Sequence, residues 1–373
     1  MLRFFEQLSP RSRKVWSCRC GQSLFFPNSQ CLACSAALGY QPRQGRLTSM
    51  QPAEQPGTWQ LDAAPDTGAW RRCANLDSPA ACNWLLPASD PHRLCIACRL
   101  NRTIPDLSIA DNHERWRKVE AAKRRLIAQL LGLGLSVVPR SENAETGLAF
   151  DFIGVDQYGQ PPTTGHAHGL ITLDIEEADD AHREQVRVHM HEPYRTLLGH
   201  FRHEIGHYYW DRLIADGPWL EPFRALFGDE RASYAAALER HYQQGPPLGW
   251  QQRFVSAYAT MHPWEDWAET WAHYLHMMDA VDTALGFGLS ARGVDLDYPP
   301  YPASVLFDPE HPGGEAFLSV INAWIELASL LNELSHSMGQ PDFYPFVLPP
   351  AAITKLHFIH LVTCRSELAR DGR

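Results

Sequence analysis

Apolar side chains recur every three or four residues over most of the chain beyond its N-terminal part, which is the period of an amphipathic helix. In residues 197–210, for example, Phe201, Ile205 and Tyr209 fall on one face. Pro193 is expected to open that helix, because the N–H that proline lacks would be unpaired there in any case. The helices predicted in this way span residues 112–131, 178–190, 197–210, 219–227, 230–242, 250–261, 264–280, 315–338 and 349–364.

Alternation of apolar and polar residues, which is typical of a half-buried strand, is clearest at residues 169–176. There Ile171 and Leu173 are separated by single polar residues. The short apolar stretches 136–139 and 148–154 are further strand candidates. Many helices with a few strands predict an α+β fold that is mostly helical and has a small sheet.

Two stretches rich in proline and glycine are predicted to be irregular. Residues 51–68 have the composition of a loop or linker, and residues 286–314 have that of a long surface loop that forms one wall of a cleft.

The helix predicted at residues 112–131 carries both an apolar stripe and a basic cluster. Its apolar members are Trp116, Val119, Leu126, Ile127 and Leu130. Its basic members are Arg115, Arg117, Lys118, Lys123, Arg124 and Arg125. Such a cluster is usually a solvated helix face, and the alternative is a contact with an acidic partner or with the cysteine-rich N-terminal part.

Composition narrows the class of protein. The 373 residues are 45% hydrophobic and 20% charged, as in an ordinary soluble globular protein. The formal net charge of −10 argues against general nucleic-acid binding. The most apolar run, 126–138, is too short to span a membrane, and the N-terminus has no signal-peptide pattern. We therefore expect a cytoplasmic protein without a membrane segment.

Eight of the nine cysteines lie within residues 1–104, in two sets of four. Close pairs of cysteines can each hold one edge of a tetrahedral thiolate site, for which Zn²⁺ is the first choice and iron the second. The sequence thus predicts an N-terminal zinc-ribbon module with one or two structural zinc ions, although cross-braced pairing of the two sets remains open. The first set is Cys18, Cys20, Cys31 and Cys34, and the second is Cys73, Cys82, Cys95 and Cys98.

The helix predicted at residues 197–210 contains the pattern HExxH. His203 and His207 lie one helical turn apart on one face, where both imidazoles can bind one Zn²⁺. Glu204 lies beside them and can take a proton from a zinc-bound water. Asp211 lies one further turn along and can orient the ring of His207.

A second stretch, residues 262–270, can supply the third protein ligand that zinc hydrolysis requires. Glu265 and Glu269 share a helix face there. We expect Glu265 to bind the metal and Glu269 to accept the N–H of a ligand histidine, which fixes the tautomer of that ring. The opposite assignment of these two glutamates remains open.

In these two stretches the chain resembles the gluzincin metallopeptidases, and it is most similar to a bacterial group of zinc-binding metallopeptidases with an N-terminal zinc ribbon. The resemblance covers nearly the whole chain and is most specific at residues 199–210 and 262–276. It implies a zincin-like metallopeptidase domain at residues 105–373, after the ribbon module at residues 1–104. In zincins an edge strand runs above the metal and binds extended peptide, and residues 169–176 are expected near that edge.

The resulting functional hypothesis is zinc-dependent hydrolysis of a peptide or amide bond, with Glu204 as the general base. Tyr258, ahead of His262 and His273, is the candidate hydrogen-bond donor to the oxyanion. The alternative is a non-enzymatic adaptor whose ribbon binds a protein partner. A nucleic-acid-binding ribbon is a third hypothesis, which the acidic net charge disfavours.

Overall fold

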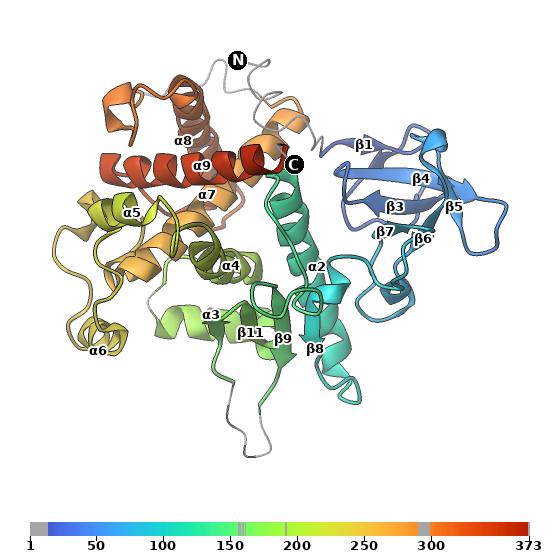
Figure 1. The fold of residues 1–373 in the computed structure, drawn as a ribbon, viewed down its shortest axis with the longest axis horizontal. Coiled ribbons are helices and arrows are strands. Elements are labelled where there is room, and N and C mark those ends of the chain that lie inside the picture. Colours follow the sequence, from blue (N-terminus) through green and yellow to red (C-terminus); the bar gives the residue numbers. More distant parts are fainter. Residues whose placement is uncertain are drawn as a thin grey trace. The chain divides into compact units, whose positions relative to one another are not determined.

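The computed structural model describes residues 14–155, 158, 160, 162–190, 192–289 and 299–371 (Figure 1). The described residues form two compact units. One, here called the N-terminal unit, ends at Val188 and also includes Gly286–Gly288. The other, here called the C-terminal unit, consists of His189–Leu285 and the residues from Leu289 onward. The predicted α+β class is confirmed. Small sheets, of which the first lie in the cysteine-rich N-terminal region, precede a series of long helices.

The first part of the N-terminal unit is built from short antiparallel strands. A two-stranded ribbon consists of β1 (Trp16–Ser17) and β2 (Ser23–Leu24). A five-stranded sheet follows in chain order, from β3 (Ala37–Gln41), β4 (Arg46–Pro52), β5 (Trp59–Leu61) and β6 (Trp70–Arg72) to β7 (Leu85–Pro87). Short 3₁₀ helices lie at Pro65–Thr67, Ala74–Asp77 and Cys98–Leu100.

The prediction that residues 51–68 form a loop or linker is wrong. The stretch contains the end of β4 and all of β5. These two strands pair with each other, and Met50 of β4 lies opposite Leu61 of β5. These two side chains are buried with Trp70 and Leu85 in one apolar cluster. Of the residues that suggested a linker, Pro52 ends β4, and the other prolines and the glycines lie in the turn between the two strands or after β5.

The second sheet of this unit has the order β10-β11-β9-β8. Its strands are β8 (Asn101–Thr103), β9 (Ala149–Ile153), β10 (Gly165–Ala167) and β11 (Leu170–Asp174). The strands predicted at 148–154 and 169–176 are thereby confirmed, whereas at 136–139 only Pro139 forms an isolated bridge, to Leu148. Proline has no N–H to donate to a sheet ladder, which explains the interruption.

Strand β11 lies beside the edge strand β10 and pairs with β9 on its other side. The predicted stretch 169–176 is therefore next to an edge among the described strands. Its expected position above the metal stays a prediction.

Helix α2 (Asp111–Gly132) connects β8 to β9 and contacts the segment after β11, a 3₁₀ turn at Ile175–Ala178. Each apolar residue predicted for its inner face is buried. The basic cluster is a solvated face only in part, because Arg117 is exposed whereas Lys123 and Arg124 are buried. The Nη1 of Arg124 donates to the carbonyl oxygen of Ala80 at 2.9 Å, so the predicted alternative, a contact with the cysteine-rich part, is confirmed for this residue.

The buried charge of Lys123 is neutralised by Glu120, one helical turn earlier, at 2.6 Å. The same carboxylate accepts from the Nδ2 of Asn101 at 2.8 Å, and the Nζ of Lys123 donates to the Oδ1 of Asn101. The other oxygen of Glu120 lies 4.0 Å from the Sγ of Cys98. This network joins α2 to the start of β8 and to the second cysteine set.

We expect Lys123→Met to destabilise the N-terminal unit by about 3 kcal/mol, because it removes the nearer of the two cations beside the buried carboxylate of Glu120 and leaves only Arg124, at 3.7 Å. Urea unfolding of the zinc-saturated protein, with α2 followed by hydrogen exchange, measures the loss. The double variant Lys123→Met/Glu120→Leu should recover most of it, and Lys118→Met, on the half-exposed part of α2, is the matched control. An unchanged exchange rate in the single variant would contradict the role of this pair.

Helices make up most of the C-terminal unit (Figure 1). They follow α3 (Asp180–His189) and are α4 (Leu197–Leu213), α5 (Leu220–Phe227), α6 (Tyr234–Gln244), α7 (Pro263–Gly286), α8 (Gly314–Ser337) and α9 (Pro350–Asp371). Each corresponds to a predicted helix within a few residues at its start. Of the predicted loop at 286–314, residues 290–298 lie outside the described residues, and the remainder contains a 3₁₀ turn at Ala303–Val305.

Two helix predictions in this unit are wrong. Pro193 does not open α4, because Thr196 is the N-cap and its hydroxyl accepts from the N–H of Gly199 at 3.0 Å. The helix predicted at 250–261 is reduced to 3₁₀ turns at Trp250–Gln252 and Tyr258–Thr260. Between them the hydroxyl of Ser256 accepts from the N–H of Ala259, a local bond that competes with helix formation.

Among the described residues, α8 has the length and apolar composition of a membrane span, with a mean hydropathy of 1.3 in its best window. The core helix of a soluble protein passes the same test, and 39% of that window is buried, so this single helix is weak evidence. The prediction that the most apolar run lies at 126–138 is wrong, because α8 contains a longer apolar window.

Candidate metal centre

Helices α4 and α7 position the predicted ligands, and they pack closely because Gly206 has no side chain. A Cβ at Gly206 would lie 3.1 Å from the Cα of Ala268 and 3.2 Å from the Cβ of Trp271. The indole N–H of Trp267 donates to the carbonyl oxygen of Gly206 at 2.8 Å. Gly206 thus leaves room for the neighbouring helix, and this contact brings the glutamates of α7 to the histidines of α4.

The structure brings His203, His207 and Glu265 together. The Nε2 atoms of the two histidines are 3.2 Å apart. The Oε2 of Glu265 lies 3.0 Å from Nε2 of His203 and 3.5 Å from Nε2 of His207. Ligand bonds of about 2.0–2.1 Å to a tetrahedral Zn²⁺ separate ligand atoms by about 3.3–3.4 Å, so this triangle has the size that zinc requires.

Glu269 holds the other side of the first imidazole. Its Oε1 accepts from the Nδ1 of His203 at 2.7 Å, so Nε2 is the nitrogen of that ring that faces the other two ligand atoms. Its Oε2 accepts from the hydroxyl of Ser256 at 2.6 Å. Both oxygens of Glu269 thus accept hydrogen bonds from other residues and do not face the three ligand atoms. This is the arrangement expected of a residue that orients the ring of His203.

Glu204 lies on α4 between the two histidines and is buried. Its Oε1 accepts from the Nε2 of His200 at 3.1 Å. Burial raises the pKa of the Glu204 carboxyl, but the hydrogen bond and charge of His200, with the charges of His203 and His207, lower that pKa to about 2. Glu204 is therefore a carboxylate at neutral pH, as a proton acceptor must be.

Two buried carboxylate oxygens at this site have no hydrogen-bond partner among the residues that the structure describes. They are Oε2 of Glu204 and Oε2 of Glu265. A buried, unsatisfied carboxylate oxygen is destabilising, and such atoms usually mark an ion or water that completes the site. A metal at Oε2 of Glu265 and a water at Oε2 of Glu204 would satisfy both, so the residues present fit zinc.

Aromatic residues surround the ligand triangle. The ring of Trp264 lies against His207, with ring centroids 3.7 Å apart, and the ring of Tyr258 lies 6.1 Å from that of His203. The hydroxyl of Tyr234 donates to the Oε1 of Glu265 at 2.9 Å. Burial raises the pKa values of Tyr234 and Tyr258, so both hydroxyls remain protonated donors.

The other predicted candidates are engaged elsewhere or differently placed. The Nε2 of His262 donates to the carbonyl oxygen of Ala232 at 3.0 Å, and His273 is buried with its Nδ1 2.6 Å from the hydroxyl of Tyr344. Asp211 is exposed on α4, and its expected role in orienting His207 stays a prediction.

Sequence reasoning missed Tyr234 and Ser256. Tyr234 begins α6 behind its N-cap Ser233, a position that a capping signal could have indicated. Its contact with Glu265 spans 31 positions of the chain, and no local pattern indicates such a contact.

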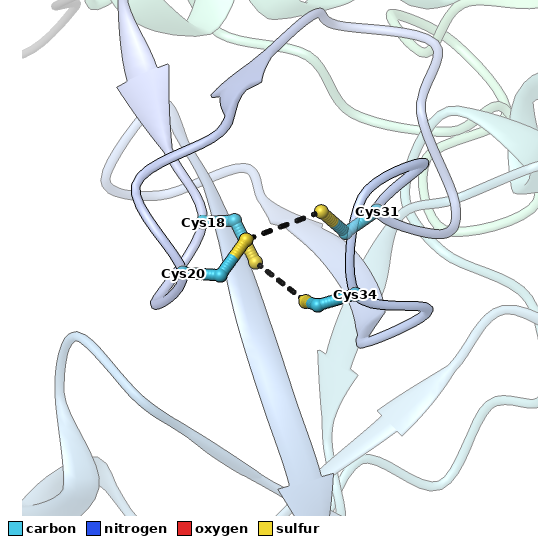
Figure 2. Close-up of side chains that lie close together, drawn as sticks. All are labelled: Cys18, Cys20, Cys31 and Cys34. Carbon is cyan, nitrogen blue, oxygen red and sulfur yellow. Dashed lines mark hydrogen bonds between the residues drawn. The ribbon is translucent and has the colours of Figure 1, made fainter.

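Each predicted set of four cysteines forms its own tetrad, so the cysteines of the two sets are not mixed by cross-bracing. In the first, Cys18 faces Cys34 with the sulfurs 3.6 Å apart, and Cys20 faces Cys31 at 3.7 Å (Figure 2). In the second, the sulfurs of Cys82 and Cys95 are 3.7 Å apart. Zinc–sulfur bonds of about 2.3 Å predict a sulfur–sulfur separation of about 3.8 Å, so these distances suit zinc.

The two thiolate sites differ in exposure. All four cysteines of the second set are buried, whereas Cys20 and Cys34 of the first set are exposed. A further group of Asp174, Glu176 and His182 also places possible ligand atoms together. His182 lies 3.8 Å from Glu176 and both side chains are about one-third exposed, which is common for such groups without a metal, so we assign none there.

Comparisons with known proteins agree with this arrangement. A family model described as "Putative zinc-binding metallo-peptidase" matches residues 112–362, and one described as "zinc-ribbon domain" matches residues 15–109. The uncharacterized proteins Rv2568c of Mycobacterium tuberculosis and Mb2598c of Mycobacterium bovis are each 47% identical to this chain over 353 residues. The alignment covers 94% of this chain and 95% of each relative. No solved structure matches the chain significantly.

The two family models meet between residues 109 and 112, whereas the compact units divide at Val188. The domain boundary predicted after residue 104 stays a prediction.

Proposed function

We propose, from the premise that this chain belongs to the zinc-binding metallo-peptidase family whose model it matches, that it hydrolyses peptide or amide bonds with one zinc ion. The resemblance to zinc-binding metallopeptidases with an N-terminal zinc ribbon is confirmed by that membership and by the matching zinc ribbon, and the likeness to gluzincins stays a prediction. The observation that carries the finer proposal is the triangle of Nε2 of His203, Nε2 of His207 and Oε2 of Glu265, with edges of 3.0–3.5 Å.

His203, His207 and Glu265 would hold the zinc, and Glu269 would keep His203 in the binding tautomer. When bound there, zinc polarises a substrate carbonyl and lowers the pKa of a coordinated water to about 7. Two thiolate zinc ions in the ribbon would be structural, because each tetrad offers four protein ligands and leaves no open position.

Glu204 supplies the base. Its carboxylate is ionised, and its Oε2 has no hydrogen-bond partner among the described residues, so that oxygen is available to take a proton from the attacking water. His200 holds the other oxygen and thereby fixes the direction in which Oε2 points. The acquired proton then goes to the leaving amine. Tyr258 remains our candidate to stabilise the negative charge that develops on the substrate carbonyl oxygen.

Incubation of the purified, zinc-loaded protein with a diverse peptide mixture, followed by mass spectrometry of new termini, tests this proposal. We expect cleavage that stops when a chelator removes zinc and returns when zinc alone is restored. Cleavage that survives removal of all bound zinc would contradict the proposal. Absence of cleavage together with a fourth protein side chain on the metal would favour the adaptor hypothesis, in which the ribbon binds a protein partner.

A further inference from the structure

The two oxygens of the Glu265 carboxylate face different partners. Oε2 points to the Nε2 atoms of both histidines, whereas Oε1 accepts from the hydroxyl of Tyr234 at 2.9 Å. Glu265 is almost fully buried, with a relative exposure of 2%, so few other groups can compete for either oxygen. The carboxylate therefore presents one oxygen to the histidines and holds the other in a protein hydrogen bond.

Tyr234 is itself held in place by its neighbours. The hydroxyl of Ser233 accepts from the N–H of Ala236 and caps α6, so Tyr234 is the first residue of a helix with a defined start. The ring of Tyr234 lies 5.4 Å from that of His262 and 6.3 Å from that of Trp264, measured between centroids. His262 is in turn anchored to the carbonyl oxygen of Ala232, which ties the start of α6 to the start of α7.

The hydroxyl of Tyr234 carries a single proton, and that proton is directed at Oε1 of Glu265. The hydrogen bond therefore engages the one oxygen of Glu265 that does not face both histidines.

A carboxylate can bind a metal through one oxygen or through both. Binding through both would occupy coordination space that a hydrolytic zinc keeps for water and substrate. We propose that Tyr234 is a positioning residue that holds Oε1 of Glu265 away from the metal, so that Glu265 binds through Oε2 alone. This inference rests on the proposed zinc site.

The test uses Tyr234→Phe in the full-length protein, because phenylalanine keeps the ring and removes only the hydroxyl. Chelator competition measures the zinc affinity of the site formed by His203, His207 and Glu265, here called the His/Glu site. In a second sample, that site is emptied and filled with Co²⁺, whose visible absorption is intense in four-coordinate and weak in five-coordinate sites. Sulfur-to-metal absorption would show whether cobalt had entered a thiolate site instead.

We expect Tyr234→Phe to weaken zinc binding about 10- to 100-fold, the usual effect of removing a partner of a metal ligand. The cobalt spectrum should lose intensity, as expected when the second carboxylate oxygen joins the metal. Tyr242→Phe, which removes a hydroxyl from an exposed ring on the same helix, should change neither.

An unchanged affinity or an unchanged cobalt spectrum in Tyr234→Phe would overturn this inference and leave the proposed function intact. A wild-type protein that binds no metal at the His/Glu site would overturn both. The two failures are therefore distinguished by the wild-type measurement alone.

Discussion

Glu204→Gln is expected to lower the rate of peptide hydrolysis at least about 100-fold while the protein keeps its zinc. Glutamine has nearly the same shape and can still meet His200, but it cannot accept a proton from water. The rate of cleavage of a peptide identified in the mixture, and the number of zinc ions per chain by native mass spectrometry, are measured together.

Glu333→Gln is the matched control. It makes the same chemical change at Glu333, whose side chain is exposed on α8, and should leave the rate unchanged. A Glu204→Gln protein that cleaves at the wild-type rate would refute the assignment of Glu204 as the base. Loss of zinc in this variant would instead mean that Glu204 holds the metal.

The largest expected effect on metal binding concerns the two glutamates of α7. We expect native mass spectrometry to find about three zinc ions per wild-type chain and one fewer in Glu265→Ala, because we propose Glu265 as one of three ligands. In Glu269→Ala all the ions should remain, with affinity at the His/Glu site lowered about 10- to 100-fold, because only the support of His203 is lost.

The reverse result, with the ion lost from Glu269→Ala and retained in Glu265→Ala, would exchange the two roles. The structure argues against that exchange because Ser256 and His203 already occupy both oxygens of Glu269. Ser256→Ala provides an additional check, since it removes one of these bonds and should weaken zinc binding less than Glu269→Ala does.

Helical period was a reliable guide wherever one face of a helix is buried. It placed α4 and α7, and the spacing of their polar residues was enough to select His203, His207, Glu265 and Glu269 as neighbours. The period of a helix converts sequence spacing directly into a shared face, so such constellations can be recognised before any tertiary structure is known.

The sequence was a poor guide where distant contacts override local composition. Residues 51–68 resemble a linker, yet Met50 and Leu61 pair across the sheet. Lys123 resembles a surface residue, and only the carboxylate of Glu120 and the side chain of Asn101 allow its burial. Tyr234 contacts Glu265 through the fold of the segment between α4 and α7, which no local pattern encodes.

The division of the chain at Val188 has a consequence for the order in which the protein matures. Both thiolate tetrads lie in the unit that is synthesised first, whereas His203, His207 and the two glutamates of α7 come later. At roughly 5–20 residues per second, the ribosome needs about 4–16 s to go from Val188 to Glu269. We therefore expect the nascent chain to take up zinc at its cysteine tetrads first, and to complete the site of His203, His207 and Glu265 only after α7 has been synthesised.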